Sequence, residues 1–304
     1  MRHLKGVPKT HVYRIIRSGE VRVNKGRASA DSRVEAGDQV RLPPVRISER
    51  VAEKAEAMAV SMRSAPARDF VILLEDDHLI AIDKPSGVAV HGGSGVSFGV
   101  IEQLRMARPQ AKFLELVHRL DRETSGILLI AKKRSALTNL QDQFRERETG
   151  KTYLALVAGR WPANKKVLDK PLHKYLLPDG ERRVKVVSRE DPDGMPSVTL
   201  VKVRESTAMA YTLLEVTIKT GRTHQIRVHL ASEGFPIVGD DKYGDFDLNK
   251  TLLRPGKLPS LKRMFLHAWC LQFNHPATGE RVELQAHLPV ELEVFAKHAA
   301  PTPT

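Results

Sequence analysis

The segment Tyr211–Thr220 constrains the fold most strongly, because apolar and polar residues alternate along it. The apolar positions are Leu214, Val216 and Ile218, and the polar positions between them are Glu215, Thr217 and Lys219. A period of two puts the two kinds of residue on opposite faces, which is typical of a half-buried antiparallel strand. The segment therefore predicts an antiparallel sheet.

Other segments carry similar strand and helix patterns in short pieces that are separated by turns. Strands are predicted over 70–74, 79–82, 127–131 and 151–158, and helices over 101–106, 136–144 and in the region that follows 221. A hairpin is predicted to join 176–188 to 197–204 around the turn 191–194. Strands outnumber helices and follow one another as hairpins, so the predicted class is α+β, with a mostly antiparallel mixed sheet flanked by helices.

The charge of the chain indicates a polyanionic partner. Lys and Arg number 49 against 36 Asp and Glu, which gives a formal net charge of +13. Nucleic acid is favoured over an anionic membrane surface, because no segment approaches the roughly 18 apolar residues that span a bilayer. The start, Met1–Thr10, lacks the apolar core of a secretory signal, and the single Cys270 excludes an intrachain disulfide and a cysteine-clustered zinc site. We expect a soluble, cytoplasmic protein.

The first 45 residues predict a small basic unit of their own. A helix is predicted over 10–18, ended by Gly19, and short strands over 21–23 and 39–42. One interpretation is an RNA-binding module, and the alternative is a basic, partly ordered tail. The basic residues that would contact RNA are Lys5, Lys9, Arg14, Arg17 and Arg22. Residues 46–69 are predicted to be a linker, 70–298 a folded domain, and 299–304 a disordered tail.

A polar turn at 117–126 precedes the apolar run 127–131 and is the strongest candidate for chemistry. Arg119 and Arg122 flank Asp121 there, and nearby positive charge favours the charged form of a carboxylate. Turns at strand ends are also where scaffolds present reactive groups. The alternative is a solvated turn with local ion pairs.

Several other chemistries are disfavoured by the sequence. It has no G-x-S-x-G motif, and His224 and His229 are five residues apart, which does not place them together on one helix face. Cys270 lies in an apolar stretch, where an inert thiol is expected. The glycine-rich loop 92–95 lacks the nucleotide-binding patterns. A carboxylate, several arginines and a tyrosine can act on a nucleic acid without a metal or a cofactor.

Four segments, in order, resemble the motifs of the RluA-group pseudouridine synthases. They are 84–87 with 90–92, 118–126, 151–155 and 221–229, and the segments 240–244 and 266–268 also fit. The resemblance covers about residues 70–295. It implies the pseudouridine synthase fold for residues 70–298 and the isomerisation of uridine to pseudouridine, with no metal and no cofactor.

Within this group, residues 4–9, 13–24 and 91–95 resemble members that act on the large ribosomal subunit. The implied substrate is 23S rRNA, free or in a large-subunit assembly intermediate, and the implied N-terminal unit is an S4-like RNA-binding domain that looks truncated at its start. Two alternatives stay open, a synthase acting on tRNA and a non-catalytic RNA-binding assembly factor. The oligomeric state cannot be read from the sequence, and we expect a monomer without a protein partner.

The resemblance also implies roles for individual residues. Asp121 would be the catalytic carboxylate, Arg222 would pair with it, and Tyr153 would pack on the uracil. Tyr153 could instead be a sheet-face residue, and Arg222 could cap a helix or bind phosphate. The residues expected to bind the substrate are Lys84, His118, Arg119, Arg122, Thr223, His224, Gln225 and Arg227.

Overall fold

The computed structural model describes residues 9–43, 66–92, 98–206, 211–254, 256 and 259–299, with side chains from residue 12 onward. The chain divides into two compact units, Met1–Ser64 and Ala65–Thr304. Most of the expected linker 46–69, the end of the glycine-rich loop and the tail 300–304 lie outside the described residues. Within the described residues, no helix has the length and apolar character needed to cross a bilayer.

The described part of the first unit, residues 9–43, contains one helix and a small sheet. Helix α1 (Lys9–Arg17) packs Ile15 against Val21 and Ala28, and Gly19 follows it with φ of 77°. The left-handed conformation at this position is easiest for glycine, which confirms that Gly19 ends the helix. The three antiparallel strands, in the order β2-β1-β3, are β1 (Arg22–Val23), β2 (Gly26–Arg27) and β3 (Val40–Arg41). Strand β2 was not predicted, because its Gly-Arg sequence reads as a turn.

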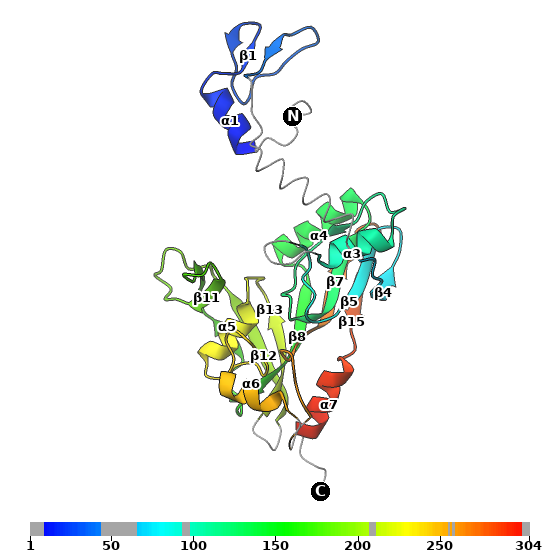
Figure 1. Cartoon of the computed structure of the whole chain (residues 1–304), viewed down its shortest axis with the longest axis vertical. Coiled ribbons are helices and arrows are strands. Elements are labelled where there is room, and N and C mark those ends of the chain that lie inside the picture. Colours follow the sequence, from blue (N-terminus) through cyan, green and yellow to red (C-terminus); the bar gives the residue numbers. More distant parts are fainter. Residues whose placement is uncertain are drawn as a thin grey trace. The chain divides into compact units, whose positions relative to one another are not determined.

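The second unit is organised around a ten-stranded sheet (Figure 1). Its main path runs β4-β5-β7-β14-β8-β13-β12-β9, while β15 pairs with β14 and β6 with β7. The strands are β4 (Val71–Glu75), β5 (Leu79–Lys84), β6 (Glu115–Leu116), β7 (Ser125–Ala131), β8 (Gly150–Ala158), β9 (Val167–Asp169), β12 (Val198–Ser206), β13 (Tyr211–Ile218), β14 (Leu266–Asn274) and β15 (Arg281–Gln285). Among the described strands of this sheet only β7 and β14 pair in parallel, which confirms the α+β class and the mostly antiparallel sheet.

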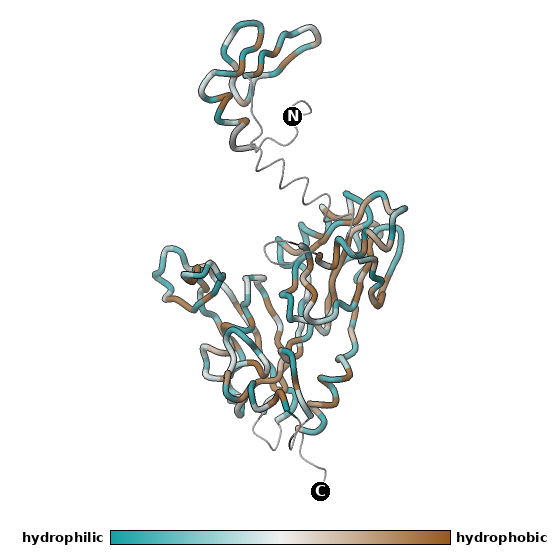
Figure 2. Tube along the Cα trace, in the orientation of Figure 1, coloured by the Kyte–Doolittle hydropathy of each residue, from teal (hydrophilic) through white to brown (hydrophobic). Residues whose placement is uncertain are grey.

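Helices α3 (Val100–Ala107) and α4 (Arg134–Glu146) cover opposite faces of β5 and β7. On β5, Ile80 and Ile82 pack in the cluster of α3, whereas Leu79 and Ala81 pack in the cluster of α4. Both faces of these strands are therefore apolar. In Figure 2 the corresponding stretches of the tube are mostly coloured as hydrophobic. The remaining helices are α5 (Gln225–Ser232), α6 (Phe246–Leu252) and α7 (Val290–Ala299).

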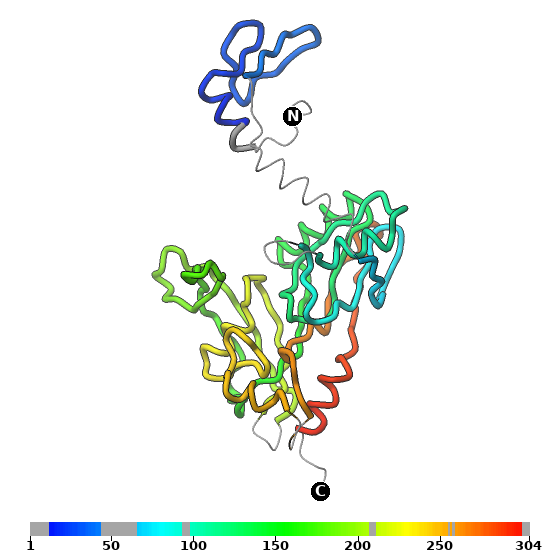
Figure 3. The backbone as a smooth tube through the Cα atoms, in the orientation of Figure 1, coloured from blue at the N-terminus to red at the C-terminus, as the bar shows by residue number. Residues whose placement is uncertain are grey.

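Strands β7 and β14 lie side by side although they are far apart in the sequence (Figure 3). Gly126 on β7 is opposite Ala268 on β14 and has φ of 111°. A Cβ atom at this position would lie 2.3 Å from the Ala268 carbonyl oxygen. Only glycine permits this close approach, which fixes the start of β7 and therefore the turn that precedes it.

The predicted pairing of 176–188 with 197–204 is wrong. Strand β10 (Leu172–Leu176) pairs with β11 (Arg182–Val186) in a separate hairpin, and β12 pairs with β9 and β13. The hairpin turn contains Pro178-Asp179-Gly180, and Gly180 has φ of 82°. This sequence is a stronger turn signal than the turn assumed at 191–194.

Candidate active site

The turn that carries Asp121 lies directly before β7 and is tied to the loop that follows β5. The Gly87 N–H donates to the Arg122 carbonyl at 2.9 Å, and the Ser86 hydroxyl donates to the Glu123 carbonyl at 2.7 Å. Thr124, which follows Glu123, is buried. These bonds hold the backbone of the turn, while the Asp121 side chain stays 27% exposed.

Lys84 ties the same two loops together from inside. Its ammonium donates to the carbonyl oxygens of Pro85, Val88 and Arg122 at 2.8–3.1 Å, and the residue is 0% exposed. Burial lowers the pKa of Lys84 to about 7, whereas the three carbonyls accept all of its protons and favour the charged form. The expectation that Lys84 binds substrate is corrected, because none of its surface faces solvent.

The cation beside Asp121 is Arg227. Its Nη1 lies 3.4 Å from Asp121 Oδ2, and its other nitrogens bind Asp240 at 2.8 and 2.6 Å. Burial alone would lower the pKa of Arg227, but the hydrogen bonds and charge of Asp240, together with the charge of Asp121, raise it. Arg227 therefore stays charged and has a fixed orientation toward Asp121.

The predicted contact between Arg222 and Asp121 is wrong among the described residues. The Arg222 Nε donates to the Pro196 carbonyl at 3.2 Å. Helix α5 begins at Gln225, so Arg222 belongs to the loop before the helix, whereas Arg227 lies on its buried side. The motif contains both arginines, and its sequence alone does not say which one turns inward.

The sequence analysis included Asp240 only within the segment 240–244 and predicted no role for it. Asp240 is fully buried, forms a bidentate pair with Arg227, and accepts hydrogen bonds from the backbone of Lys242 and Tyr243. Burial raises the pKa of Asp240, and its bonds with Arg227 lower it below its usual value. An aspartate that directly follows the apolar segment 235–239 was the signal available.

His224 approaches Asp121 from the start of α5. Its Nε2 lies 4.0 Å from Asp121 Oδ1, and its Nδ1 is 2.8 Å from the Tyr243 hydroxyl. Burial lowers the pKa of His224, and the charge of Asp121 acts in the opposite direction. His224 thus lies near the carboxylate as a mainly neutral ring at pH 7.

Tyr153 contributes the aromatic wall of the site. It lies on β8, opposite Val216 of β13 and Ala268 of β14, and it is half-buried. Burial, and secondarily the charge of Asp121, raise the pKa of the Tyr153 hydroxyl. The phenol is therefore protonated at neutral pH.

These side chains line two connected cavities. The inner cavity has a volume of about 90 Å³, and Asp121 is the single carboxylate among the described residues that line it. Tyr153, Arg222, His224 and Arg227 also line it. A wider cavity of about 450 Å³ shares Arg119, Leu120, Asp121, His224 and Arg227 with it and opens toward Glu181 and Lys242.

The other residues expected to bind substrate differ in whether their polar atoms are bonded within the protein. Gln225 is corrected to a structural role, because its amide bonds Thr220, Val198, Thr199 and the Arg222 backbone within the protein. His118 stacks on Phe144 and accepts a hydrogen bond from the Leu129 N–H at Nε2. Arg119 is exposed at both cavities, Arg122 bonds the Gly87 carbonyl and Glu123, and Thr223 is half-buried.

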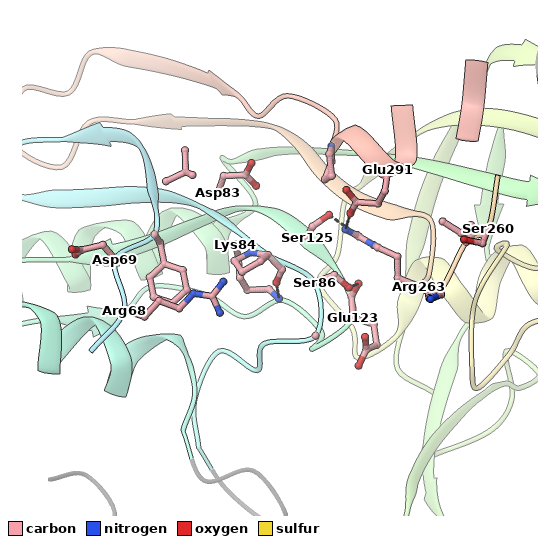
Figure 4. A pocket seen from close by; sticks show the side chains of 17 residues that line it. Arg68, Asp69, Asp83, Lys84, Ser86, Glu123, Ser125, Ser260, Arg263 and Glu291 are labelled. Atoms are coloured by element: carbon pink, nitrogen blue, oxygen red, sulfur yellow. Dashed lines mark hydrogen bonds and ion pairs between the residues drawn. The ribbon is translucent and has the colours of Figure 1, made fainter. Parts of the chain in front are cut away.

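A larger cavity of about 850 Å³ lies behind the Asp121 turn (Figure 4). Two of its cations, Lys84 and Arg263, are bonded within the protein, whereas the Asp83 Oδ1 atom is buried without a hydrogen-bond partner among the described residues. Arg263 donates to the Ser125 hydroxyl at 2.6 Å and pairs with Glu291 at 3.0 Å, as the dashed lines show. Ser125 in turn is 2.9 Å from His267 Nδ1. The cavity borders the Asp121 turn at Glu123 and Ser125.

Two further sets of residues lie outside this site. Within the described residues, His173, Asp191 and Asp193 have ligand-type atoms within 4.8 Å of one another, a grouping that the sequence analysis did not anticipate. In the first unit, the expected RNA-contacting residues Arg14, Arg17 and Arg22 are exposed. Lys5 and the Lys9 side chain lie outside the described residues.

Comparison with known proteins assigns both parts of the chain. Residues 78–232 match the family of RNA pseudouridylate synthases, and residues 1–40 match the S4 domain. The chain is 54% identical to ribosomal large subunit pseudouridine synthase C of Salmonella typhimurium, over 93% of this chain and 86% of that protein. It is 53% identical to the protein of that name from Escherichia coli strain K12, with the same coverage.

The solved structures agree with this assignment. Human RNA pseudouridylate synthase domain containing 4 is 26% identical and superposes with a TM-score of 0.59, covering 81% of this chain and 97% of that one. Human RNA pseudouridylate synthase domain containing 1 superposes with a TM-score of 0.58 at 25% identity, covering 78% and 97%. With this fold, the N-terminal S4 domain and relatives that match almost its whole length, the chain belongs to the RNA pseudouridylate synthase family.

Proposed function

We propose that this chain converts specific uridines of 23S ribosomal RNA to pseudouridine, with Asp121 as the catalytic carboxylate. The observation that carries the proposal is the single carboxylate of the inner cavity, placed beside Arg227 and Tyr153. The names of the relatives, which specify the large ribosomal subunit, support the choice of RNA. Since this RNA is the substrate, we place the protein in the cytoplasm.

The reaction is an isomerisation and needs no oxidant or reductant. The bond between C1′ and N1 breaks, the uracil turns, and a bond between C1′ and C5 forms. The proton on C5 leaves, and N1 gains one, so atoms and electrons balance. A carboxylate with free lone pairs, held by one arginine, can serve this sequence as nucleophile or base.

Arg227 is proposed to aim the carboxylate rather than to touch the uracil. Asp240 takes the shorter and stronger bonds of its guanidinium, so the 3.4 Å contact leaves Asp121 only loosely held. The target base must leave its stack to reach the cavity, at a cost of a few kcal/mol. Tyr153, protonated and half-buried, is suited to pack on the extruded uracil.

The S4 domain is proposed to add affinity through phosphate contacts. Arg14, Arg17 and Arg22 are exposed on a unit whose small core, around Ile15, faces away from them. Such contacts position a protein on RNA without reading its sequence.

The test measures release of tritium from RNA that carries it on uracil C5. With a large-subunit rRNA fragment, we expect D121N to lose at least about a thousandfold in rate. The matched control is D241N, because Asp241 also contacts Arg227, at 3.1 Å, but its side chain is 63% exposed and lies outside the inner cavity. D241N should keep its rate within a few-fold.

Two results would contradict the proposal. Tritium release by D121N at the wild-type rate would exclude Asp121 as the catalytic carboxylate. Release from tRNA, but not from the rRNA fragment, by the wild-type protein would assign a different substrate.

A further inference from the structure

A third cavity, on the other side of Tyr153, carries positive charge that the protein does not neutralise. Its volume is about 630 Å³, and it shares Arg119, Tyr153, Ile218 and Gly221 with the inner cavity. Pockets of about 300–1,000 Å³ accommodate small ligands. Because the two cavities share these lining residues, the third cavity is a direct extension of the candidate active site.

Lys151 is the unusual group in its wall. It lies on β8 two residues before Tyr153, so both side chains emerge from the same face of the sheet. Lys151 is only 9% exposed, and its ammonium lies 5.2 Å from the centroid of the Phe144 ring. Among the described residues, no hydrogen bond or ion pair engages its ammonium.

The surroundings of Lys151 further disfavour its charged form. Burial, followed by the positive charges of Arg147 and Lys219, lowers the pKa of Lys151. Neither of these two residues forms an ion pair within the described part of the chain. Lys151 is thus a buried ammonium that no ion pair neutralises among the described residues, near two exposed cations, and this costs free energy in the unbound protein.

The carboxylates of the cavity are already engaged elsewhere. Glu102 accepts hydrogen bonds from the backbone N–H groups of Gly92 and Gly99, at 3.1 and 2.9 Å. Glu115 pairs with Arg105 at 3.0 Å. Neither is available to Lys151, so among the described residues its charge is left for an anionic ligand to balance.

We propose that this cavity binds a backbone phosphate of the RNA nucleotide that adjoins the target uridine, with Lys151 as the phosphate-binding residue. The inference rests on the proposed function, because the shared wall at Tyr153 places the cavity one step from the reacting base. An RNA strand whose target uridine enters the inner cavity continues past Tyr153, and its phosphates are the anions nearest to Lys151. The exposed Arg119 faces both cavities and can follow the same strand.

The decisive variant is K151M, which removes the charge and keeps an apolar stem. We expect RNA affinity to fall roughly five- to tenfold. The dependence of log affinity on log salt should weaken by about 0.7, the value for one phosphate contact with single-stranded RNA. In tritium release, KM should rise while kcat stays within about twofold, because the contact binds substrate and transition state equally.

Two controls separate this role from others. K151R keeps the charge and should retain most of the affinity. K297M removes a lysine on α7 that is 72% exposed and paired with Glu293, and it should leave the affinity and salt slope unchanged. The melting temperature of K151M should stay at or above that of the wild type, because a buried, unneutralised charge is removed.

Either of two outcomes would overturn the inference. The first is a K151M protein with wild-type affinity and salt slope. The second is a fall of its melting temperature by more than about 5 °C, which would show that Lys151 serves the fold. A third result would separate the two proposals. If the wild-type protein releases no tritium but K151M still weakens the salt dependence of RNA binding, the proposed function is contradicted and the phosphate site stands.

Discussion

Two cavities adjoin the elements of the Asp121 site and differ in whether the buried lysine in the wall of each is bonded to protein groups. The cavity behind the turn, about 850 Å³, contains Lys84 and Arg263, and both are bonded to protein groups. The cavity beside Tyr153, about 630 Å³, contains Lys151, which has no such partner among the described residues. Size alone would favour the first as a ligand site, whereas the unpaired lysine favours the second. We therefore infer that the first region supports the Asp121 turn and that the second receives substrate.

The same substitution at two buried lysines should therefore have very different effects on stability. K84M leaves three carbonyl oxygens without their donor, and we expect the free energy of unfolding to fall by about 3–5 kcal/mol. K151M should change it by no more than about 1 kcal/mol. Urea unfolding of both variants measures the contrast, and equal losses would erase the distinction between the two regions.

K84M should also slow the reaction although Lys84 touches no substrate. Loss of the bond to the Arg122 carbonyl frees the turn that carries Asp121. A displacement of about 1 Å costs on the order of a hundredfold in rate. Tritium release at saturating RNA, measured where the variant is fully folded, tests this expectation. An unchanged kcat would show that the Gly87 and Ser86 bonds hold the turn without Lys84.

Two buried histidines, His267 and His118, should also make stability depend on pH. Burial lowers the pKa of His267 to about 4, and that of His118 likewise to about 4. The unfolded chain takes up these protons near pH 6.5, so stability is complete above this pH and is lost as pH falls toward 4. Each histidine contributes up to about 3 kcal/mol of this loss.

The pH prediction can be checked by urea unfolding at pH 7.5 and pH 5.0. H267Q should show a smaller difference between the two pH values than the wild type, because glutamine does not titrate. H298Q is the matched control, since His298 is exposed near the end of α7. A difference for H267Q as large as that of the wild type would contradict the assignment.

Arg263 gives the smallest expected effect. R263M loses the bond to Ser125 and the pair with the half-exposed Glu291, which we expect to cost about 1–2 kcal/mol. The salt dependence of RNA binding should not change, in contrast to K151M. Filter binding over a series of salt concentrations compares the two variants, and a weaker slope for R263M would mean that RNA also reaches the cavity behind the turn.

Much of the fold could be predicted from local patterns. The alternation in Tyr211–Thr220 gave β13, and the apolar run after Asp121 gave most of β7, because burial imposes a period on these segments. The pairing of β12 could not be read in the same way. It depends on which distant strand offers an edge, and the Pro-Asp-Gly turn at 178–180 was overlooked.

The candidate site shows the same limit. The motifs identified Asp121, Tyr153 and the segment of Arg227, but which arginine faces Asp121 depends on where α5 begins and on Asp240, a residue from another loop. Lys84 and Gln225, which were expected to bind substrate, form hydrogen bonds within the protein, and a motif does not reveal whether its polar atoms are satisfied in this way. Such information comes only from tertiary structure.

The central claim is that this chain makes pseudouridine in 23S rRNA through Asp121. A strain that lacks the gene can be complemented with the wild-type protein or with D121N, and pseudouridines mapped by carbodiimide treatment and reverse transcription. We predict that specific 23S rRNA sites disappear in the deletion, return with the wild type and stay absent with D121N. Return of the same sites with D121N, or an unchanged 23S rRNA map in the deletion strain, would contradict the claim.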